Sequence, residues 1–507
     1  MKKKREALKK ENVMYLHNID CDSTIFPFLE KVAAKDSATE ADLYPFIDEL
    51  SDTNVTDVYL NVNAQCSVSP SAVFDDMIKN YEKKVENGIP VDYTKTLWGP
   101  YRVMKEFGLD PFAVWFRRIR EIGRRSHLSI RMNDCHCPDE ETCWLRTDFF
   151  YTARENGWMN GPAHGYYRCT LNYRVPEVRK YFLDYIREQL FRYDVDGLEL
   201  DFMRERVCFD YTVDPPALCV SIMNDFIREV KALVKEAEAK YGHAIEITAR
   251  TPRDLAKSLA FGFDCVTWER EGLVDRIVPS PRFQGSDTHL PIAEWKAALP
   301  KTKITACIES LISSDWGMSH NGLACMTAEM VRGNAASYLA QGSDGIYTFN
   351  LFGQGCGGGE IEVARDYEVQ KTVGSYEETV KHPLRFATIP EDFDSSPAAL
   401  ARWEPVPTDI EDTWELPYVT GKLPSDKKGK LLLGLSAGSI EDVAVSVNGK
   451  PFTGFSADTL PYPANAAEKD SLIYSAPLAL TEECYTVKIE KRTDKKVRLS
   501  WVEIDAR

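Results

Sequence analysis

Two acidic residues alternate with apolar ones in the segment from Tyr193 to Glu205, which reads YDVDGLELDFMRE. Side chains two positions apart share one face of a β-strand, so Glu199 and Asp201 lie together while the leucines beside them point the opposite way. Inside a closed barrel, unpaired carboxylates cost roughly several kcal/mol, so they must meet cations, hydrogen-bond donors or a substrate. Arg204 and Arg206 are nearby cations. An internal ion network and a catalytic site both fit this pattern.

Another carboxylate ends a second apolar run. The run begins at Ile304, and Glu309 stands at its C-terminal edge, where barrels of alternating strands and helices hold catalytic groups. Two carboxylates across a barrel mouth can divide into an acid of raised pKa and an ionised base or nucleophile, the arrangement that cleavage of a glycosidic bond requires. We therefore predict Asp201 and Glu309 as catalytic residues, with a helix-start role for Glu309 as the alternative.

Other predicted strand ends are polar as well. Hydroxyl-rich ligands are bound by such rings of donors and acceptors, and aromatic side chains in the loops add faces that stack on sugar rings. The alternatives are loop capping for each polar residue and a core position for each tryptophan. The residues predicted to bind substrate are Asp20, Asp134, His136, Glu199, Arg204, Arg250, Trp268 and Asn350.

No metal or cofactor is predicted. Cys135, Cys137 and Cys143 surround His136, but their spacing is not that of zinc ligands and no second pair follows. The loop 353–359 contains G-x-G-x-x-G without a βαβ unit and a ribose-binding acid after it. The later strand ends carry no lysine, which argues against a Schiff-base aldolase.

Short apolar runs alternate with helical stretches through the first 390 residues, which predicts βα units around a parallel sheet. Helices are expected at 111–125, 176–193 and 216–241. The expected strands are 13–18, 55–63, 127–133, 195–202, 244–249, 275–278, 303–309 and 345–350. This α/β pattern predicts a (β/α)8 TIM barrel, with the long insertions 64–108 and 135–172 on its C-terminal face.

The sequence after residue 390 has a different pattern. An acidic, proline-bearing linker precedes short alternating strands joined by turn signals such as Asn448-Gly449, which predicts a small all-β sandwich. We expect a barrel catalytic domain at 1–390 and a C-terminal β-sandwich domain at 391–507. The second domain acts either as a stabilising appendage or as a carbohydrate-binding module.

Composition narrows the function classes. The 507 residues carry a formal net charge of −16, which repels polyanions, so no nucleic-acid partner is expected. No apolar run is long enough to predict a membrane span, and the chain as given shows no signal peptide. Thirteen cysteines fit a reducing compartment, so we expect a cytoplasmic protein, with a trimmed export signal left open. The expected partner is a carbohydrate substrate, and a homo-oligomer stays open.

The barrel portion resembles the glycoside-hydrolase-like TIM-barrel proteins, a group related to the family 10-like glycosyl hydrolases. The matching segments are SIRMNDCH (129–136), YDVDGLELDFMR (193–204), ITARTP (247–252), DCVTWEREGLVDRIVP (264–279) and QGSDGIYTFNLF (341–352). The resemblance covers about residues 10–380. It implies a barrel with sugar-directed chemistry and carries over no catalytic pair.

The sequence differs at particular positions from the motifs of two further families. Family 18 chitinases carry D-G-x-D-x-D-x-E on strand four, but Met203 stands here in place of the catalytic glutamate, so substrate-assisted chemistry is not expected unless Glu205 replaces it. The acids on predicted strands four and seven are similar to the layout of clan A retaining enzymes. Those enzymes have an Asn-Glu pair on strand four, and this chain lacks it.

The leading hypothesis is a glycoside hydrolase in which Asp201 and Glu309 flank the scissile bond. One alternative is a metal-dependent lyase or isomerase acting on a sugar, with the ion at Asp134, His136, Glu199 and Asp201. The other is a non-catalytic carbohydrate-binding barrel.

Overall fold

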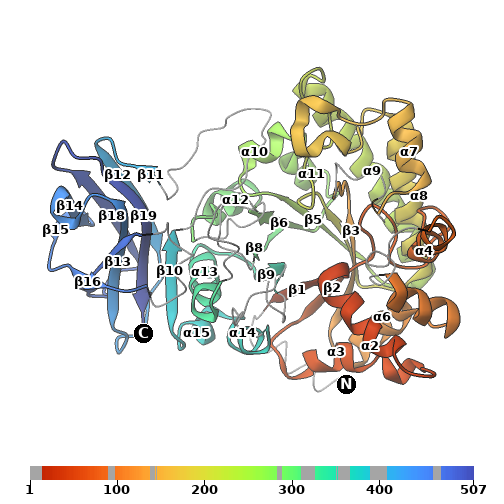
Figure 1. Ribbon diagram of the computed structural model, residues 1–507, viewed down its shortest axis with the longest axis horizontal. Coiled ribbons are helices and arrows are strands. Elements are labelled where there is room, and N and C mark those ends of the chain that lie inside the picture. The colour runs from red at the N-terminus through yellow and green to blue at the C-terminus, as the bar shows by residue number, and fades with distance from the viewer. Residues whose placement is uncertain are drawn as a thin grey trace.

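The computed structural model describes residues 14–88, 97–136, 143, 145–281, 288–309, 326–349, 351, 366–388, 408–460 and 470–507. A parallel sheet surrounded by helices forms the larger part of the molecule, and two antiparallel sheets form the C-terminal part (Figure 1).

The parallel sheet curves into a nearly closed barrel, which confirms the α/β barrel prediction. Its strands are β1 (Tyr15–Ile19), β2 (Asp57–Asn61), β3 (Arg125–Arg131), β4 (Gly197–Asp201), β5 (Glu246–Pro252), β6 (Arg276–Ser280), β7 (Lys303–Ile304), β8 (Ala306–Glu309) and β9 (Ile346–Phe349). They pair in the order β7-β6-β5-β4-β3-β2-β1-β9-β8. Only Thr305 separates β7, which pairs with β6, from β8, which pairs with β9. The expected seventh strand is therefore divided in two, and the sheet has nine strands where eight were expected.

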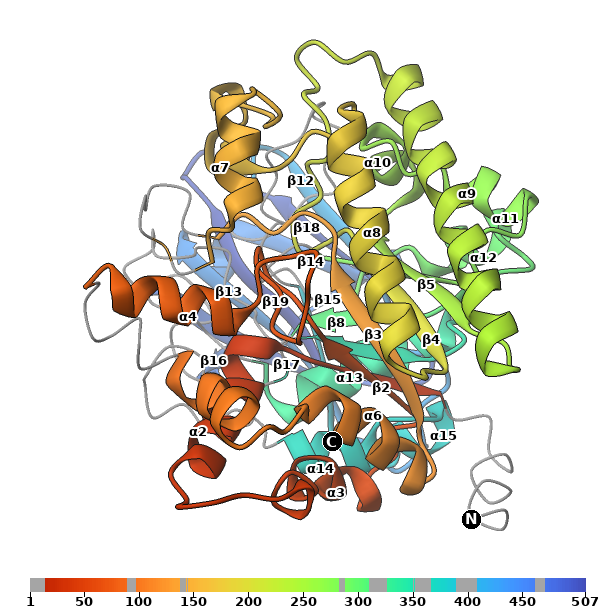
Figure 2. The same ribbon diagram turned by 90° about the vertical axis from the view of Figure 1, so that its right-hand side faces the viewer.

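Helices cover the outside of this sheet (Figure 2). The described helices of the barrel region are α2 (Phe26–Ala33), α3 (Pro45–Asp48), α4 (Met77–Glu86), α6 (Pro111–Glu121), α7 (Asp148–Glu155), α8 (Pro176–Arg192), α9 (Pro216–Tyr241), α10 (Leu255–Ala260), α11 (Cys265–Arg270), α12 (Ile292–Ala298), α13 (Ala328–Ala340), α14 (Asp366–Thr372) and α15 (Tyr376–Thr379). Proline opens α6, α8 and α9, where its fixed φ suits a first turn and its missing N–H is not needed. The helix expected at 111–125 ends at Glu121, because Gly123, with φ of 84°, leads into β3.

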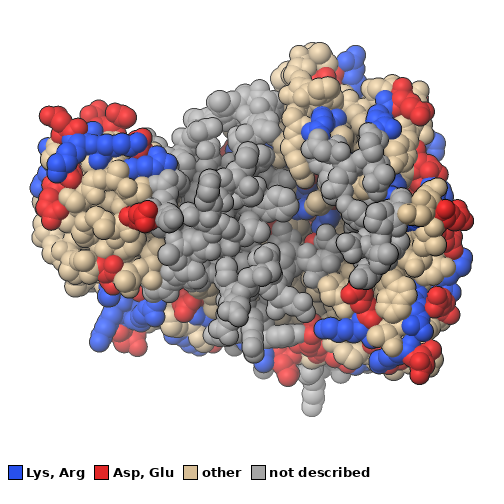
Figure 3. Space-filling model, in the orientation of Figure 1, with Lys and Arg blue, Asp and Glu red and all other residues tan. Residues whose placement is uncertain are grey.

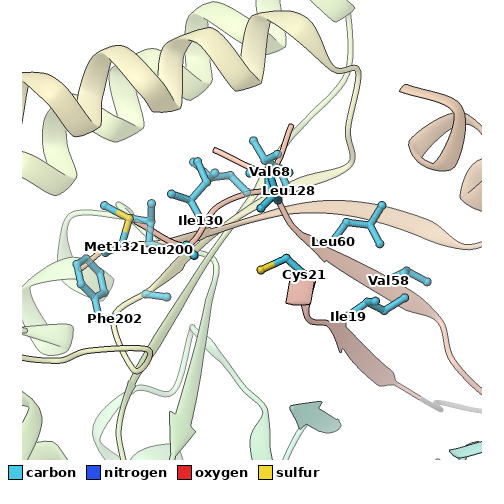
Figure 4. Packing of buried hydrophobic residues seen from close by; sticks show 14 of the residues in the cluster. Ile19, Cys21, Val58, Leu60, Val68, Leu128, Ile130, Met132, Leu200 and Phe202 are labelled. Carbon is cyan, nitrogen blue, oxygen red and sulfur yellow. The ribbon is translucent and has the colours of Figure 1, made fainter. Parts of the chain in front are cut away.

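The outward face of the barrel strands is mainly apolar, and β3 and β4 carry polar residues on their inward face. Residues such as Val58, Leu128 and Leu200 pack into a hydrophobic cluster under the helices (Figure 4). The alternate residues of the same strands, such as Ser129 and Glu199, bond to one another across the interior. Because side chains alternate between the two faces of a strand, these polar side chains point into the barrel, as the sequence predicts for β4.

An ion network fills the N-terminal end of the barrel interior. His127 on β3 lies 2.8 Å from Asp57 on β2, and Arg125 lies 3.0 Å from the same carboxylate. Arg276 on β6 lies 2.8 Å from Glu246 on β5. These pairs link four strands at the N-terminal end, where a barrel places its stabilising residues.

The antiparallel part contains two sheets. Its strands are β10 (Leu384–Thr388), β11 (Thr408–Asp409), β12 (Thr413–Val419), β13 (Gly429–Ala437), β14 (Val443–Val447), β15 (Lys450–Phe452), β16 (Ser456–Asp458), β17 (Leu472–Leu478), β18 (Cys484–Lys491) and β19 (Arg498–Ala506). One sheet has the order β10-β19-β13-β17-β16, with β11 beside β19, and the other has the order β12-β18-β14-β15. Residues of both sheets share one hydrophobic cluster. The predicted turn at Asn448-Gly449 joins β14 to β15, with φ of 50° and 73°.

Helix α13 attaches the antiparallel part to the barrel. Ten of its thirteen residues are buried, because it packs against β8 and β9 of the barrel and against β10. A Cβ at Gly333 would lie 2.0 Å from the carbonyl oxygen of Arg385, so glycine permits this close backbone approach. Strand β10 begins before residue 391 and pairs with β19. The division into domains after residue 390 stays a prediction.

The length of the helices and the distribution of surface charge are the last two features of the fold. No helix in the described ranges combines the length and the apolar character needed to cross a membrane. On the face shown in Figure 3, acidic and basic side chains are interspersed over the described residues.

We predict that Gly197→Ala destabilises the barrel by about 1 to 3 kcal/mol, as an extra methyl group does in a packed interior. A Cβ at Gly197 would lie 2.2 Å from Nδ1 of His127, its register partner on β3. Urea unfolding of the wild type, both single variants and the Gly197→Ala/His127→Ala double variant measures the effect. The loss in unfolding free energy caused by Gly197→Ala should be smaller when His127 is replaced by alanine. An equal penalty in both backgrounds would contradict this explanation.

Candidate active site

One guanidinium at the C-terminal end of the barrel contacts both predicted catalytic carboxylates. Arg250 on β5 lies 3.3 Å from Asp201 on β4 through Nη1 and 3.6 Å from Glu309 on β8 through Nη2. All three side chains are at most 3% exposed. Two acids from distant positions in the sequence therefore meet at one buried cation, which balances one of their negative charges.

The chain after β4 fixes the orientation of Asp201. Its Oδ1 accepts hydrogen bonds from the backbone N–H of Met203 at 2.9 Å and of Arg204 at 3.1 Å. Both donors belong to the turn that directly follows the strand. Because backbone donors hold one oxygen and Arg250 approaches both, the carboxylate is set by rigid neighbours rather than by solvent.

Arg250 is itself held in place. Its Nε donates to Ser280 Oγ at 3.1 Å, and its guanidinium lies 3.7 Å from the ring centroid of Phe349. Burial alone lowers the pKa of Arg250, but attraction to Asp201 and other neighbours more than offsets this and holds the pKa above its ordinary range. The site therefore keeps a permanent positive charge between its two acids.

Glu199 lies on the same face of β4 as Asp201 and is fully buried. Its Oε2 accepts hydrogen bonds from Ser129 Oγ at 2.6 Å and Asn18 Nδ2 at 3.2 Å, while its Oε1 has no hydrogen-bond partner in the described part of the chain. Burial, and to a lesser extent the charge of Asp201, raises the pKa of Glu199 to about 7. Glu199 is therefore a buried acid that holds a proton below neutral pH.

A second polar cluster lies at the ends of β1, β3 and β4. Arg131 contacts Asp20 and lies 3.1 Å from Asp134. His136 Nδ1 lies 2.6 Å from Asp134 Oδ1, and Arg204 contacts His136 Nε2. Burial raises the pKa of Asp134, but His136, Arg131 and Arg204 outweigh it and hold this pKa well below its usual range. Asp134 is therefore a carboxylate held by cations and an imidazole.

A small cavity of about 30 Å³ adjoins this cluster. Arg131, Asn133 and Asp134 line one side of it, and aromatic side chains including Phe149 and Phe150 line the other. Its volume suits one or two water molecules or a small substituent of a ligand.

The structure brings together eight of the ten predicted site residues in these two connected clusters. Trp268 is not among them: it is fully buried on α11, and its Nε1 donates to Asn224 Oδ1 of α9 at 2.7 Å. It therefore packs between helices and does not face the barrel mouth. Asn350 lies outside the described residues.

Several residues of the site were not predicted from the sequence, among them Ser129, Arg131 and Ser280. Alternation in the segment SIRMND places Ser129 and Arg131 on one face of β3, which is a signal for the first two. Ser280 is recognised only through its bond to Arg250, which depends on the pairing of β5 with β6.

The described residues contain no group of three or more His, Cys, Asp or Glu side chains placed to hold a metal ion. Asp134 and Asp201 face arginines instead. The ligand set of the metal-dependent alternative is therefore not assembled. Cys137 lies outside the described residues.

Comparisons with known proteins give distant structural neighbours. No family model and no curated protein matches the chain. Among solved structures, a cycloisomaltooligosaccharide glucanotransferase from Paenibacillus sp. matches at 10% identity and a TM-score of 0.36, over 96% of this chain and 57% of that one. The PgaB (BpsB) glycoside hydrolase domain from Bordetella bronchiseptica matches at 10% identity and a TM-score of 0.39, over 66% of this chain and 93% of that one. An alpha-L-fucosidase from Vibrio sp. strain EJY3 matches at 11% identity and a TM-score of 0.36, over 99% of this chain and 98% of that one.

This chain therefore spans 57% of the length of the glucanotransferase. Identities and TM-scores this low assign neither an activity nor a catalytic residue to the chain. The resemblance to the family 10-like group stays a prediction.

We predict that Glu199→Gln removes a pH dependence of stability. Between about pH 4.5 and 7 the folded protein keeps the Glu199 proton while the unfolded chain releases it, so wild-type stability falls relative to the variant as pH rises through this window. Urea unfolding at several pH values measures the difference. The exposed Glu229→Gln is the control and should show no such trend. A constant difference between wild type and Glu199→Gln would contradict the assignment.

Proposed function

We propose that this barrel hydrolyses a glycosidic bond, with Asp201 and Glu309 flanking the bond that is cleaved. The observation that carries the proposal is the shared contact of both carboxylates with Arg250 at the C-terminal end of the barrel. Barrel enzymes place their chemistry at this end, and paired carboxylates are the groups that cleave glycosidic bonds.

The two carboxylates differ in their surroundings. Asp201 accepts two backbone N–H donors and faces Arg250, so its negative charge is stabilised by fixed dipoles as well as by a cation. We assign it to stabilise the positive charge that develops on the sugar ring in the transition state. Glu309, on the other side of Arg250, then protonates the leaving oxygen.

The second cluster supplies groups that bind hydroxyls. Arg204, His136, Asp134 and Asp20 offer donors and acceptors beside the catalytic pair. Such groups form bidentate contacts to the hydroxyls of a sugar. A carbohydrate is therefore the substrate class that this surface favours, and no cofactor is required for the step.

We predict that Asp201→Asn and Glu309→Gln each lower kcat/KM by at least about 100-fold, because each removes a charge or a proton that the transition state needs. Hydrolysis of aryl glycosides and natural oligosaccharides of both anomers measures the effect. Asp225→Asn removes a 66% exposed carboxylate that pairs with Arg228 on α9 and should leave the rate unchanged.

Two results would count against hydrolysis. Full activity in both site variants would remove the carboxylates from the mechanism. Sugar binding by calorimetry without turnover, unaltered by either substitution, would favour a carbohydrate-binding barrel.

A further inference from the structure

We propose that His136, oriented by Asp134, is a general base at the barrel mouth that takes a proton from the water attacking the sugar. This inference rests on the proposed hydrolysis and adds a third catalytic residue to the pair Asp201 and Glu309.

The contacts of Asp134 decide which imidazole nitrogen carries the proton. Asp134 Oδ1 lies 2.6 Å from His136 Nδ1 and accepts the backbone N–H of His136 at 3.0 Å. Its Oδ2 lies 3.1 Å from Arg131 and 3.8 Å from Arg204. A carboxylate held this firmly accepts a hydrogen bond from Nδ1–H, which leaves Nε2 as the basic nitrogen.

The second ring nitrogen of His136 contacts Arg204, which also bonds to Asp201. Arg204 contacts His136 Nε2 through Nη2, and the backbone N–H of the same residue donates to Asp201 Oδ1 at 3.1 Å. One residue therefore joins the imidazole to a catalytic carboxylate. An arginine N–H donates to Nε2 only when Nε2 is unprotonated, so this contact fits the tautomer that Asp134 selects. In the complex, a water or a sugar hydroxyl takes the place of Arg204.

Other histidine–aspartate pairs show what distinguishes His136. His127 and Asp57 lie 2.8 Å apart, but the imidazole is fully buried at the N-terminal end of the barrel. His243 and Asp194 lie 2.6 Å apart beside the start of β5, at the end away from the site. The His136 side chain is 20% exposed and follows the C-terminal end of β3. It combines a fixed tautomer with access to substrate.

Charged groups face His136 and Asp134 from several elements. Arg131 and Arg204 face His136 or its partner from β3 and from the turn after β4, opposite the carboxylate of Asp134. Asp20 contacts Arg131, and Glu205, Tyr166 and Cys135 are further titratable groups beside this cluster. The imidazolium that forms during the step is stabilised by Asp134, as in a histidine–carboxylate pair of a hydrolase.

Glu309 gives its proton to the leaving oxygen, which takes the electrons of the broken C–O bond. Water bonds to the anomeric carbon and passes one proton to His136 Nε2. That proton then returns through solvent to Glu309, so both products carry hydroxyl groups and the enzyme is unchanged.

We expect His136→Gln to lower kcat/KM by about 100-fold to 10,000-fold at neutral pH, the usual contribution of a general base. The fall should lie mainly in kcat, because glutamine still bonds to hydroxyls. The pH dependence of kcat/KM should differ between the wild type and the variant, because the variant lacks the general base. His243→Gln, with the same pair distance at the opposite end, should keep the wild-type pH profile.

A nitrogen-15 NMR spectrum of the wild-type histidines tests the inference without turnover. It should show His136 as the neutral tautomer protonated on Nδ1. The Nε2-protonated tautomer would overturn the inference. A rate and a pH profile that stay unchanged in His136→Gln would also overturn it.

Failure of the proposed function gives a different result. In that case the wild type cleaves none of the glycosides, while the NMR spectrum still reports the tautomer. Absence of wild-type turnover would therefore contradict both the proposed hydrolysis and the role of His136 as a base. If the wild type is active and the His136→Gln variant is equally active, only the role of His136 is contradicted.

Discussion

The C-terminal end of the barrel depends on the contacts of the Arg250 guanidinium. The guanidinium lies between Asp201 and Glu309, with all three side chains almost fully buried. Without a cation, two buried carboxylates would repel each other and each would lack the solvation that water provides. Ser280 and Phe349 fix the guanidinium, so the geometry of the acids is set by β5, β6 and β9 as much as by their own strands.

This arrangement requires a rigid base. Ion pairs at the N-terminal end join β2, β3, β5 and β6, and Gly197 gives β4 room beside His127. Above this layer, Ser129 and Asn18 bond to Glu199 and tie β4 to β3 and β1. On the far side, α13 packs between the barrel and β10 with almost no solvent contact. Each layer limits the movement of the strands that end in the site.

Local patterns predicted a large part of this structure. Alternation in the segment around Glu199 and Asp201 placed both acids on the interior face, since side-chain period is a property of the strand itself. The prolines that open α8 and α9 likewise act locally. Trp268 shows the limit: an aromatic residue near a barrel end looks the same in sequence whether it faces a ligand or, as here, packs against α9. The contacts of Arg250 with both Asp201 and Glu309 could not be predicted from local sequence patterns either, because they depend on which strands become neighbours.

Glu199 differs from other acids of the barrel in its partners. In the described ion pairs of the barrel strands and the turns after them, several carboxylates face cations. The carboxylates include Asp20, Asp57, Asp134, Asp201, Glu246 and Glu309, and the cations include Arg125, Arg131, Arg204, Arg250, Arg276 and Lys303.

Glu199 is not among these paired carboxylates, and its oxygen Oε2 receives only neutral donors. Burial, and to a lesser extent the charge of Asp201, raises the pKa of Glu199 to about 7, while the positive charge of Arg250 acts in the opposite direction. A neutral Glu199 therefore adds no second negative charge beside Asp201 on β4. The charge around Asp201 and Arg250 is thus linked to the proton on Glu199, two residues earlier on the same strand.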